Sequence, residues 1–292
     1  MQSYAVITAV RNEAAHIDRT IRAVLAQDVR PARWAIASDG STDDTETIVA
    51  AHSQRHPFIV LVRVDGDANR NFGSKVRALH AAEAALTGCD YDCIANLDGD
   101  ITFGPAYFST LLERLRQDPR LGIAGGWIHE DYGRGFVPRR QNMAAMVPHA
   151  VQCVRRTCYE EIGGYAPLRY GGEDTCAVVE AQMRGWRVQA FDDLPVRHYR
   201  RTASAGSVLR NRFRQGRADQ ALGYAPWFEV LKCARRLLDP PVIVGSALWL
   251  SGFAWSYVAA EARPVSPEFV AFLRSQQRAR LVTPRQPIAT TP

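Results

Sequence analysis

Two aspartates separated by one glycine, Asp98-Gly99-Asp100, follow an apolar run that is expected to be a buried strand. Their carboxylates repel each other at this spacing, and a hard divalent cation, which prefers oxygen ligands, would relieve that repulsion. An Asp-Gly turn between a strand and a helix uses the same residues without any ion. For an isolated motif of this kind the turn is the more frequent explanation, so a metal site needs support from other residues.

A second acid, Asp39, ends another apolar run and begins the polar segment 39–44. A carboxylate in that position can hydrogen-bond a base or a ribose, as the acid of dinucleotide-binding folds does. It can also cap the following helix, but Ser41, Thr42 and Asp43 are able to do so instead. Asp39 is therefore available for a ligand.

Paired glycines at 171–172 precede Glu173 and Asp174 at an expected helix start. Glycine allows a backbone to approach a ligand closely, and acids in the first helical turn are stabilised by the helix dipole. A carboxylate held there can act as a general base. Taken alone, the same pattern is also that of an ordinary capped helix.

The chain is rich in arginine, which makes bidentate contacts with phosphates, and it contains only two lysines. Its formal charge is +6, from 36 Lys and Arg against 30 Asp and Glu. Residues 196–217 carry seven arginines, His198 and no acid. Most of these arginines suit a solvated helix face or anionic lipid, whereas His198 suits a metal ion and Arg200 and Arg201 suit a pyrophosphate. The sequence has no basic run of the kind that binds nucleic acid, so no nucleic-acid partner is expected.

The elements that must position these residues alternate between strand and helix over the first hundred residues. The pattern predicts strands at 4–10, 34–37, 58–64 and 92–97, and helices at 14–26, 43–54 and 73–87. Such alternation is typical of an α/β fold with a mainly parallel sheet, in which ligands bind beyond the carboxyl ends of the strands. A domain over residues 1–202 continues with a helix at 105–117, a strand at 121–127 and an irregular region at 128–150. A short segment around 151–157, a helix that begins near Gly172 and a strand at 186–191 follow.

Residues 203–280 are predicted to form a helical, basic C-terminal module, followed by a disordered tail at 281–292. The segment 242–260 has nineteen residues without a charge, close to the roughly 20 that cross a bilayer. We interpret the module as peripheral on the inner face of the cytoplasmic membrane, with arginines on anionic headgroups; a buried helical hairpin fits the segment equally well. Six irregularly spaced cysteines and the lack of a basic leader indicate a cytoplasmic protein with reduced thiols.

Taken together, four stretches resemble, in order, the motifs of the family 2 glycosyltransferases, whose GT-A fold is a Rossmann-like, mainly parallel twisted sheet with helices on both faces. The matches are the opening strand and N-E turn at 6–13, the D-G-S-x-D-x-T signature at 39–45, the D-x-D at 98–100, and G-G-Y…E-D at 163–165 and 173–174. The resemblance covers residues 4–200. It is specific to the family and not to one sugar.

This resemblance implies a role for each matching residue. Asp174 would be the catalytic base, with Glu173 beside it. Asp39 would bind the nucleotide base, and Asp98 the ribose or a metal-bound water. Asp100 would ligate Mn²⁺ or Mg²⁺. The expected metal ligands are Asp98, Asp100 and His198, and the expected nucleotide-sugar contacts are Thr8, Glu13, Asp39, Lys75, Asp98, Arg200 and Arg201.

The implied activity is inverting transfer of one sugar from a nucleotide diphosphate sugar, a UDP-sugar by preference, to a hydroxyl acceptor. The Q-x-x-R-W motif of processive members has no counterpart in 208–215, which favours transfer of a single sugar. The usual Pro-x-Tyr is missing before the N-E turn, and Ser74 and His80 depart from the family's pattern around Lys75. If the C-terminal module meets lipid, a polyprenyl-linked glycan acceptor and a role in cell-envelope or exopolysaccharide synthesis follow.

Two rival functions use the same residues. A non-catalytic nucleotide-sugar or lipid-binding protein on this scaffold would not need intact Asp98, Asp100 and Asp174. A haloacid-dehalogenase-type phosphatase would share the D-x-D-x-T at 98–102 and use 192–193 as its downstream acids. That chemistry normally needs a lysine between the two motifs and a nucleophile after the first strand. Here the sequence has no such lysine, and three strand–helix units precede the motif.

Overall fold

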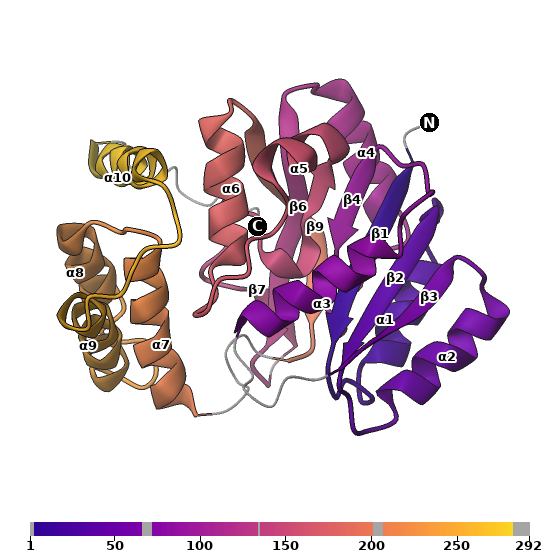
Figure 1. The fold of residues 1–292 in the computed structure, drawn as a ribbon, viewed down its shortest axis with the longest axis horizontal. Coiled ribbons are helices and arrows are strands. Elements are labelled where there is room, and N and C mark those ends of the chain that lie inside the picture. The colour runs from indigo at the N-terminus through magenta and orange to yellow at the C-terminus, as the bar shows by residue number, and fades with distance from the viewer. Residues whose placement is uncertain (1–2, 66–71, 134, 201–206, 283–292) are drawn as a thin grey trace. The chain divides into compact units, whose positions relative to one another are not determined.

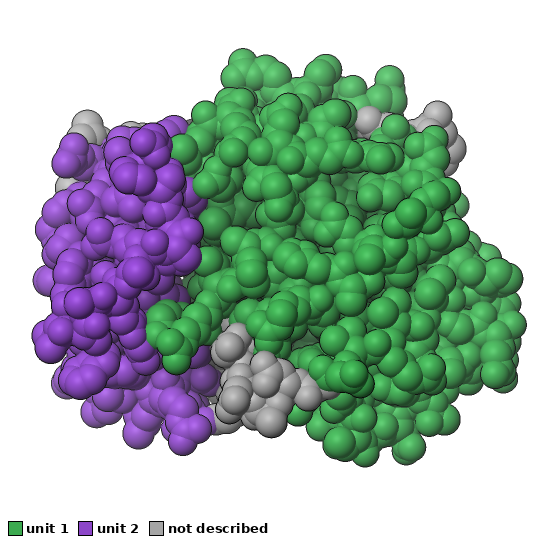
Figure 2. All heavy atoms as spheres, viewed as in Figure 1, with its two compact units in different colours: residues 1–204 green, residues 205–292 purple. Residues whose placement is uncertain are grey.

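In the computed structural model of the chain, residues 3–65, 72–133, 135–200 and 207–282 are described. The chain divides into two compact units, Met1–Ser204 and Ala205–Pro292 (Figure 2). The sequence-based boundary between 202 and 203, and positions 283–292 of the expected tail, lie outside the described residues. The first unit contains the sheet, and the described part of the second is helical.

The first unit is built on one mixed sheet with helices around it (Figure 1). Its strands follow the order β3-β2-β1-β4-β8-β6-β9-β5, and β7 pairs with β6 outside this path. The strands are β1 (Tyr4–Val10), β2 (Arg33–Asp39), β3 (Ile59–Val64), β4 (Cys93–Asn96), β5 (Ile101–Phe103), β6 (Leu121–Asp131), β7 (Phe136–Pro138), β8 (Cys153–Arg155) and β9 (Arg187–His198). β1, β2 and β4 are buried almost throughout, as expected for parallel strands covered on both faces.

The first half of the sheet is parallel, because a helix connects each of its successive strands from β1 to β4. β1 pairs with β2 and β4, and β2 pairs with β3, all in parallel. The carboxyl ends of these strands therefore lie at one edge, where Asp39 ends β2 and Asp98 follows β4 by two residues. The helices of this unit are α1 (Ile17–Leu25), α2 (Thr45–Arg55), α3 (Phe72–Ala84), α4 (Tyr107–Gln117), α5 (Arg156–Ile162), α6 (Glu173–Met183) and the 3₁₀ helix η1 (His149–Val151). The predicted α/β fold is confirmed.

The second half of the sheet differs from the mainly parallel arrangement predicted from the sequence. β8 is antiparallel to β4 and β6, and β5 is antiparallel to β9, while β6 and β9 are parallel. The predicted irregular region 128–150 contains the end of β6 and all of β7, which pair with each other. β9 continues from its predicted end at 191 to His198, past two acids and Pro195, because a register shift against β6 accommodates this polar stretch.

The second unit consists of helices over its described residues. They are α7 (Val208–Ala221), α8 (Pro226–Arg235), α9 (Val244–Val258) and α10 (Pro267–Val282). α7 and α9 approach closely, since a Cβ on Gly252 would collide with the carbonyl oxygen of Phe213, and one on Gly216 with that of Trp249. Among the described residues no helix combines the length and apolar character needed to cross a membrane.

Candidate active site

The Asp98-Gly99-Asp100 turn is held rigidly at the carboxyl edge of the parallel strands. The hydroxyl of Thr20, from α1, lies 2.9 Å from the carbonyl oxygens of both Gly99 and Ile101. A Cβ on Gly99 would come within 2.9 Å of Val10, so a larger residue does not fit between the two carboxylates without movement. Asp100 is buried, with 6% of its surface exposed. The turn therefore keeps one carboxylate inside the protein and places the other beside it.

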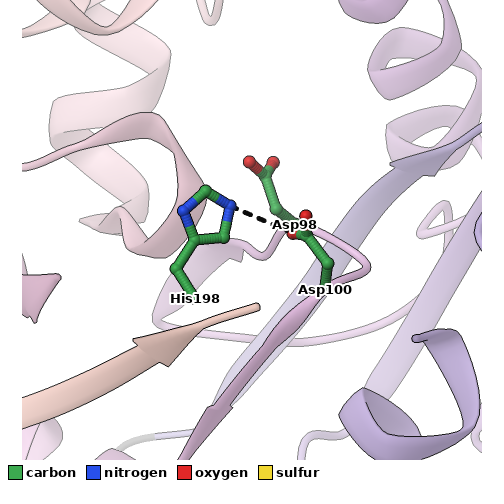
Figure 3. Close-up of side chains that lie close together, drawn as sticks. All are labelled: Asp98, Asp100 and His198. Atoms are coloured by element: carbon green, nitrogen blue, oxygen red, sulfur yellow. Dashed lines mark ion pairs between the residues drawn. The ribbon is translucent and has the colours of Figure 1, made fainter. Parts of the chain in front are cut away.

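His198 is brought to this turn by the pairing of β5 with β9. Ile101 lies opposite His198 in the register, and Nε2 of His198 is 3.3 Å from Oδ1 of Asp100. Figure 3 shows the imidazole facing the two aspartates. One ligand atom from each of Asp98, Asp100 and His198 can be chosen so that all lie within 4.8 Å of one another. Two carboxylates and an imidazole at this spacing fit a single divalent cation of the Mn²⁺ type, and Mg²⁺ less well because it favours oxygen ligands alone.

The charges around the turn show how closely these groups interact. Burial and the neighbouring Asp100 carboxylate raise the pKa of Glu13 to about 7. Burial opposes protonation of His198, but the carboxylates of Asp100 and Glu130 outweigh it and raise the pKa of His198 to about 9. Burial would likewise raise the pKa of Asp98, but the Lys75 ammonium outweighs it and lowers that pKa to about 2. The site is thus a concentration of negative charge that attracts cations.

Two cationic side chains border the carboxylates. Nζ of Lys75, in α3, lies 2.8 Å from Oδ1 of Asp98. Nη2 of Arg200 lies 2.6 Å from Oε2 of Glu13, and its Nε lies 3.9 Å from Oδ2 of Asp100. These groups are placed to contact an anionic ligand such as a diphosphate. Arg201, which the sequence assigned to the same role, lies outside the described residues.

Asp39 lies at the same edge of the sheet, on the far side of β1. It is buried, with 7% of its surface exposed, and Nη1 of Arg11 lies 3.7 Å from its Oδ2. The loop after it is tied to the N-E turn, because the backbone N–H of Thr42 donates to Oδ1 of Asn12 at 2.8 Å. Asn12 has φ of +54°, a left-handed conformation that asparagine tolerates better than most residues. The two motifs therefore form one connected surface.

Glu173 and Asp174 open α6 after two glycines with positive φ, as the sequence predicted for a helix start. Burial raises the pKa of Glu173, and this side chain interacts electrostatically with Lys75 and Asp98. Asp174 is half-buried in the first turn, where its Oδ1 accepts a hydrogen bond from the N–H of Thr175 at 2.7 Å. Glu173 thus belongs to the charge cluster, and Asp174 is the more accessible of the two acids.

Thr8 is placed differently from the other candidates. Its side chain is fully buried in β1, and its Oγ1 accepts a hydrogen bond from Nε1 of Trp34 at 2.9 Å. This contact satisfies the buried indole N–H. Thr8 therefore has a clear structural role in the core.

Three buried polar residues near the site were not singled out from the sequence. Oε1 of Glu130, at the end of β6, lies 3.8 Å from Nδ1 of His198. Nδ1 of His149 lies 3.8 Å from Oε1 of Glu173. The hydroxyl of Tyr165 is buried next to the His149 ring and has no hydrogen-bond partner among the described residues. Only the G-G-Y motif gave a signal for any of them, because Glu130 and His149 fall in the region predicted to be irregular.

Comparisons with known proteins give matches over much of the chain. The family model described as Glycosyl transferase family 2 matches residues 5–194. The chain is 27% identical over 143 residues to an N-acetylglucosaminyl-diphospho-decaprenol L-rhamnosyltransferase from Mycobacterium tuberculosis, covering 47% of this chain and 44% of that protein. The chain spans less than half the length of the curated relatives it matches.

Solved structures show the same fold. A mannosyltransferase from Pyrobaculum calidifontis in complex with GDP-Man and Mn²⁺ has a TM-score of 0.56 at 18% identity, covering 96% of this chain and 81% of that one. TarS 1–349 from S. aureus in complex with UDP-GlcNAc has a TM-score of 0.54 at 14% identity, covering 95% and 83%. At these identities the likeness concerns the fold alone, and the expected GT-A fold is confirmed.

Proposed function

The chain belongs to glycosyl transferase family 2, and on that premise we propose that it moves one sugar, with inversion, from a nucleoside diphosphate sugar to a hydroxyl acceptor. The observation that carries this proposal is the convergence of Asp98, Asp100 and His198, from two strand ends, next to Lys75 and Arg200. Acids and cations placed together in this way would suit a divalent cation together with a diphosphate.

The donor would extend along the carboxyl edge of the parallel strands. Asp39 ends β2 and Asp98 follows β4, the two strands that flank β1, so the strand spacing puts these strand ends about 10 Å apart. We assign Asp39 to the nucleotide base and Asp98 to the ribose or a metal-bound water, while Glu13 orients Arg200. A UDP-sugar is the donor we favour. Supporting facts are the D-G-S-x-D-x-T match at 39–45 and the UDP-GlcNAc complex of TarS, a fold neighbour.

Asp98, Asp100 and His198 would hold the divalent cation, Mn²⁺ or Mg²⁺. When bound, such an ion stabilises the negative charge that grows on the leaving diphosphate. Arg200 and Lys75 add positive charge on the same side, so they orient the diphosphate and favour its departure. Asp100 is buried, so a contact made by its carboxylate is less screened by water than one made at the surface.

Asp174 would act as the base. The acceptor hydroxyl attacks the anomeric carbon from the face opposite the diphosphate, while its proton passes to the Asp174 carboxylate. The new C–O bond forms as the bond to the diphosphate breaks, and the anomeric configuration inverts. Glu173, the buried neighbour of Asp174 in the sequence, would hold the start of α6 in place and contribute to the charge of the site. No covalent intermediate with the protein is required.

The acceptor we favour is a polyprenyl-linked glycan of cell-envelope or exopolysaccharide synthesis. The printed name of the M. tuberculosis relative describes a decaprenol-linked acceptor. We place the protein in the cytoplasm, at the inner face of the membrane. All six cysteines are free, which agrees with a reducing compartment.

Binding of nucleoside diphosphate sugars to the full chain tests the proposal. In a thermal-shift screen with and without Mn²⁺, a UDP-sugar should raise the midpoint only when the metal is present, by the equivalent of about 2.7 kcal/mol at a hundredfold excess over Kd. Product analysis with that donor and a lipid-linked acceptor should then show transfer with inversion. Metal-independent binding without transfer would support the non-catalytic alternative. Binding of no nucleotide sugar would overturn the proposal.

A further inference from the structure

The α9 helix has two faces of unexpected character. The face that packs within the helical unit is buried and contains Gly245, Ser246, Trp249, Gly252, Phe253 and Ser256. The opposite face is exposed, apart from the half-buried Leu248, and contains Val244, Ala247, Leu248, Ser251, Ala254, Trp255 and Val258. The exposed face is therefore at least as apolar as the buried one, and neither carries a charge. A helix on the surface of a water-soluble protein normally shows a polar outer face.

The connection from α8 to α9 extends this exposed apolar character. Leu238 is 83% exposed, Ile243 is 62% exposed and Val242 is 51% exposed. Leu237, just before them, is 42% exposed. We name the α9 surface as these four residues together with the exposed face of α9. Contiguous exposed aliphatic side chains of this number mark an interaction site, whereas scattered ones do not.

The charge of the helical unit is positive. Residues 207–282 contain eleven Lys or Arg and five Asp or Glu, a formal charge of +6, whereas residues 1–206 have 24 and 25, a charge of −1. Arg235 is exposed immediately before the connection. Glu229, one of the few acids of this unit, is buried and paired with Lys232 at 2.7 Å. The unit that carries the α9 surface is thus basic as a whole, with Arg235 beside the surface and one acid, Asp239, within the connection.

We propose that the α9 surface embeds in the headgroup boundary of an anionic lipid bilayer, with α9 parallel to the membrane plane. α9 has 15 residues, about 22 Å at 1.5 Å per residue, and is too short for a hydrocarbon core of about 30 Å. It can therefore lie on a bilayer and not cross it. Basic residues beside an apolar face are the composition of such interfacial helices.

Charge complementarity favours lipid over a second copy of the chain. A symmetric dimer through the α9 surface would bring the basic side chains of two copies together, whereas anionic headgroups supply the opposite charge. Trp255 and Tyr257, which are 53% and 43% exposed, are of the types that anchor in a headgroup region. This inference deepens the proposed function, since it names the surface by which the enzyme would reach a lipid-linked acceptor.

Vesicle co-sedimentation of the full chain tests this surface. We expect binding to phosphatidylcholine vesicles containing about 25% phosphatidylglycerol, weaker binding to phosphatidylcholine alone, and weakening by salt. Ile243→Glu and Leu238→Glu, at exposed positions, should each lower partitioning by about tenfold, because they place a carboxylate in the interface. Val137→Glu, at a 43% exposed valine of β7 outside this surface, is the matched control and should bind normally.

Depth is measured with brominated lipids, which quench tryptophan emission within the bilayer. Of the six tryptophans only Trp255 belongs to the exposed part of the α9 surface, so a minor fraction of the emission should be quenched, and this quenching should be lost in Trp255→Phe. Absence of binding to anionic vesicles would overturn the inference. So would a dimer in solution that Ile243→Glu dissociates, with no difference between the variants on vesicles.

The test of the lipid surface can fail or succeed independently of the test of the proposed function. Mn²⁺-dependent nucleotide binding by Ile243→Glu should equal that of the unaltered chain, because this residue is outside the candidate active site. If no nucleotide sugar binds while vesicle binding persists, the proposed function fails and the lipid surface stands. If nucleotide binding persists without vesicle binding, the lipid surface fails alone.

Discussion

The two units of the chain place polar and apolar groups in opposite ways. In the first, Asp100, Glu130 and Glu173 are at least 94% buried, although charged groups prefer water. In the second, Leu238 and Val258 are 83% and 78% exposed, although aliphatic groups prefer the interior. Each arrangement is unfavourable without partners. His198 and Arg200 partly compensate the buried Asp100, and a bound ligand would add to this, whereas the exposed aliphatic groups have water as their neighbour. The buried acids of the first unit suit a small charged ligand, and the exposed aliphatic side chains of the second suit a lipid bilayer.

Among the variants that test this difference between the two units, we expect the largest loss of activity from a substitution at the start of α6. Asp174→Asn removes the proposed base while keeping the size of the side chain. We expect a loss of about 10²- to 10⁴-fold in kcat, the usual contribution of a general base, with donor affinity changed by less than about twofold. Single-turnover kinetics with the donor found in the thermal-shift screen measures the loss in rate. Calorimetry measures the donor affinity.

Vesicle binding by Asp174→Asn should be unchanged, because the substituted residue is in the other unit. Equal losses in donor affinity and kcat would show that Asp174 binds the donor and is not the base. In that case Glu173→Gln becomes the variant to measure, since Glu173 is the other acid of the motif.

The next effect concerns the metal. Asp100→Ala removes one of the three candidate ligands, and we expect Mn²⁺ affinity to fall by more than about a hundredfold, beyond the loss typical of residues that only support a ligand. Electron paramagnetic resonance of free Mn²⁺ gives this affinity without any enzyme assay. A lowered thermal midpoint with unchanged Mn²⁺ binding would mean that Asp100 is structural. If Asp100→Ala still binds vesicles normally, the metal site and the lipid surface function independently.

A third test weakens the helical unit without touching the site. Gly252→Ala places a Cβ against the backbone carbonyl of Phe213, which cannot move aside as a flexible side chain would. We expect a loss of about 1–3 kcal/mol in the stability of this unit, more than the helix-propensity gain of about 1 kcal/mol from replacing glycine. Differential scanning calorimetry together with the vesicle assay measures the result.

Gly104→Ala is the matched control, because a Cβ there meets nothing within 4 Å. It should leave the thermal midpoint nearly unchanged. If Gly252→Ala abolished Mn²⁺ binding as strongly as vesicle binding, the two units would be coupled, and the contrast between them would lose its functional meaning.

The sequence predicted those parts of the site that depend on local pattern. Asp39 and Asp98 were found because each ends an apolar run of a strand–helix alternation, and Asp174 because glycines and acids mark a helix start. The pairing of His198 with Asp100 depends on antiparallel β5 and β9, and no local pattern indicates that register. Thr8 shows that a motif position can also mislead. The motif suggested a ligand contact, but the hydroxyl of Thr8 accepts a hydrogen bond from the indole of Trp34 in the core.

Glu130 was missed for a related reason. It lies in β6 beyond the predicted end of that strand, because the glycines that follow suggested an irregular segment. Its contact with His198 also requires β6 and β9 to be parallel with a register shift near Gly126 and Trp127. A shift of one residue would turn Glu130 to the other face of the sheet. Such a contact is a property of the assembled sheet and not of either segment.

The smallest expected effect belongs to this same residue. We expect Glu130 to orient His198, because its Oε1 lies 3.8 Å from Nδ1 while Nε2 faces Asp100. A carboxylate behind a histidine ligand fixes the ring and increases its basicity. Glu130→Gln keeps an acceptor but loses the charge, so Mn²⁺ affinity should fall about tenfold, and Glu130→Leu should lower it further. Asp131→Asn is the control, since the neighbouring side chain points to the opposite face and is exposed. Manganese titration of the folded variants tests this role of Glu130. A lower thermal midpoint with normal Mn²⁺ affinity would mean that Glu130 only stabilises the fold. The burial of its charge would then need an explanation other than a bound metal ion.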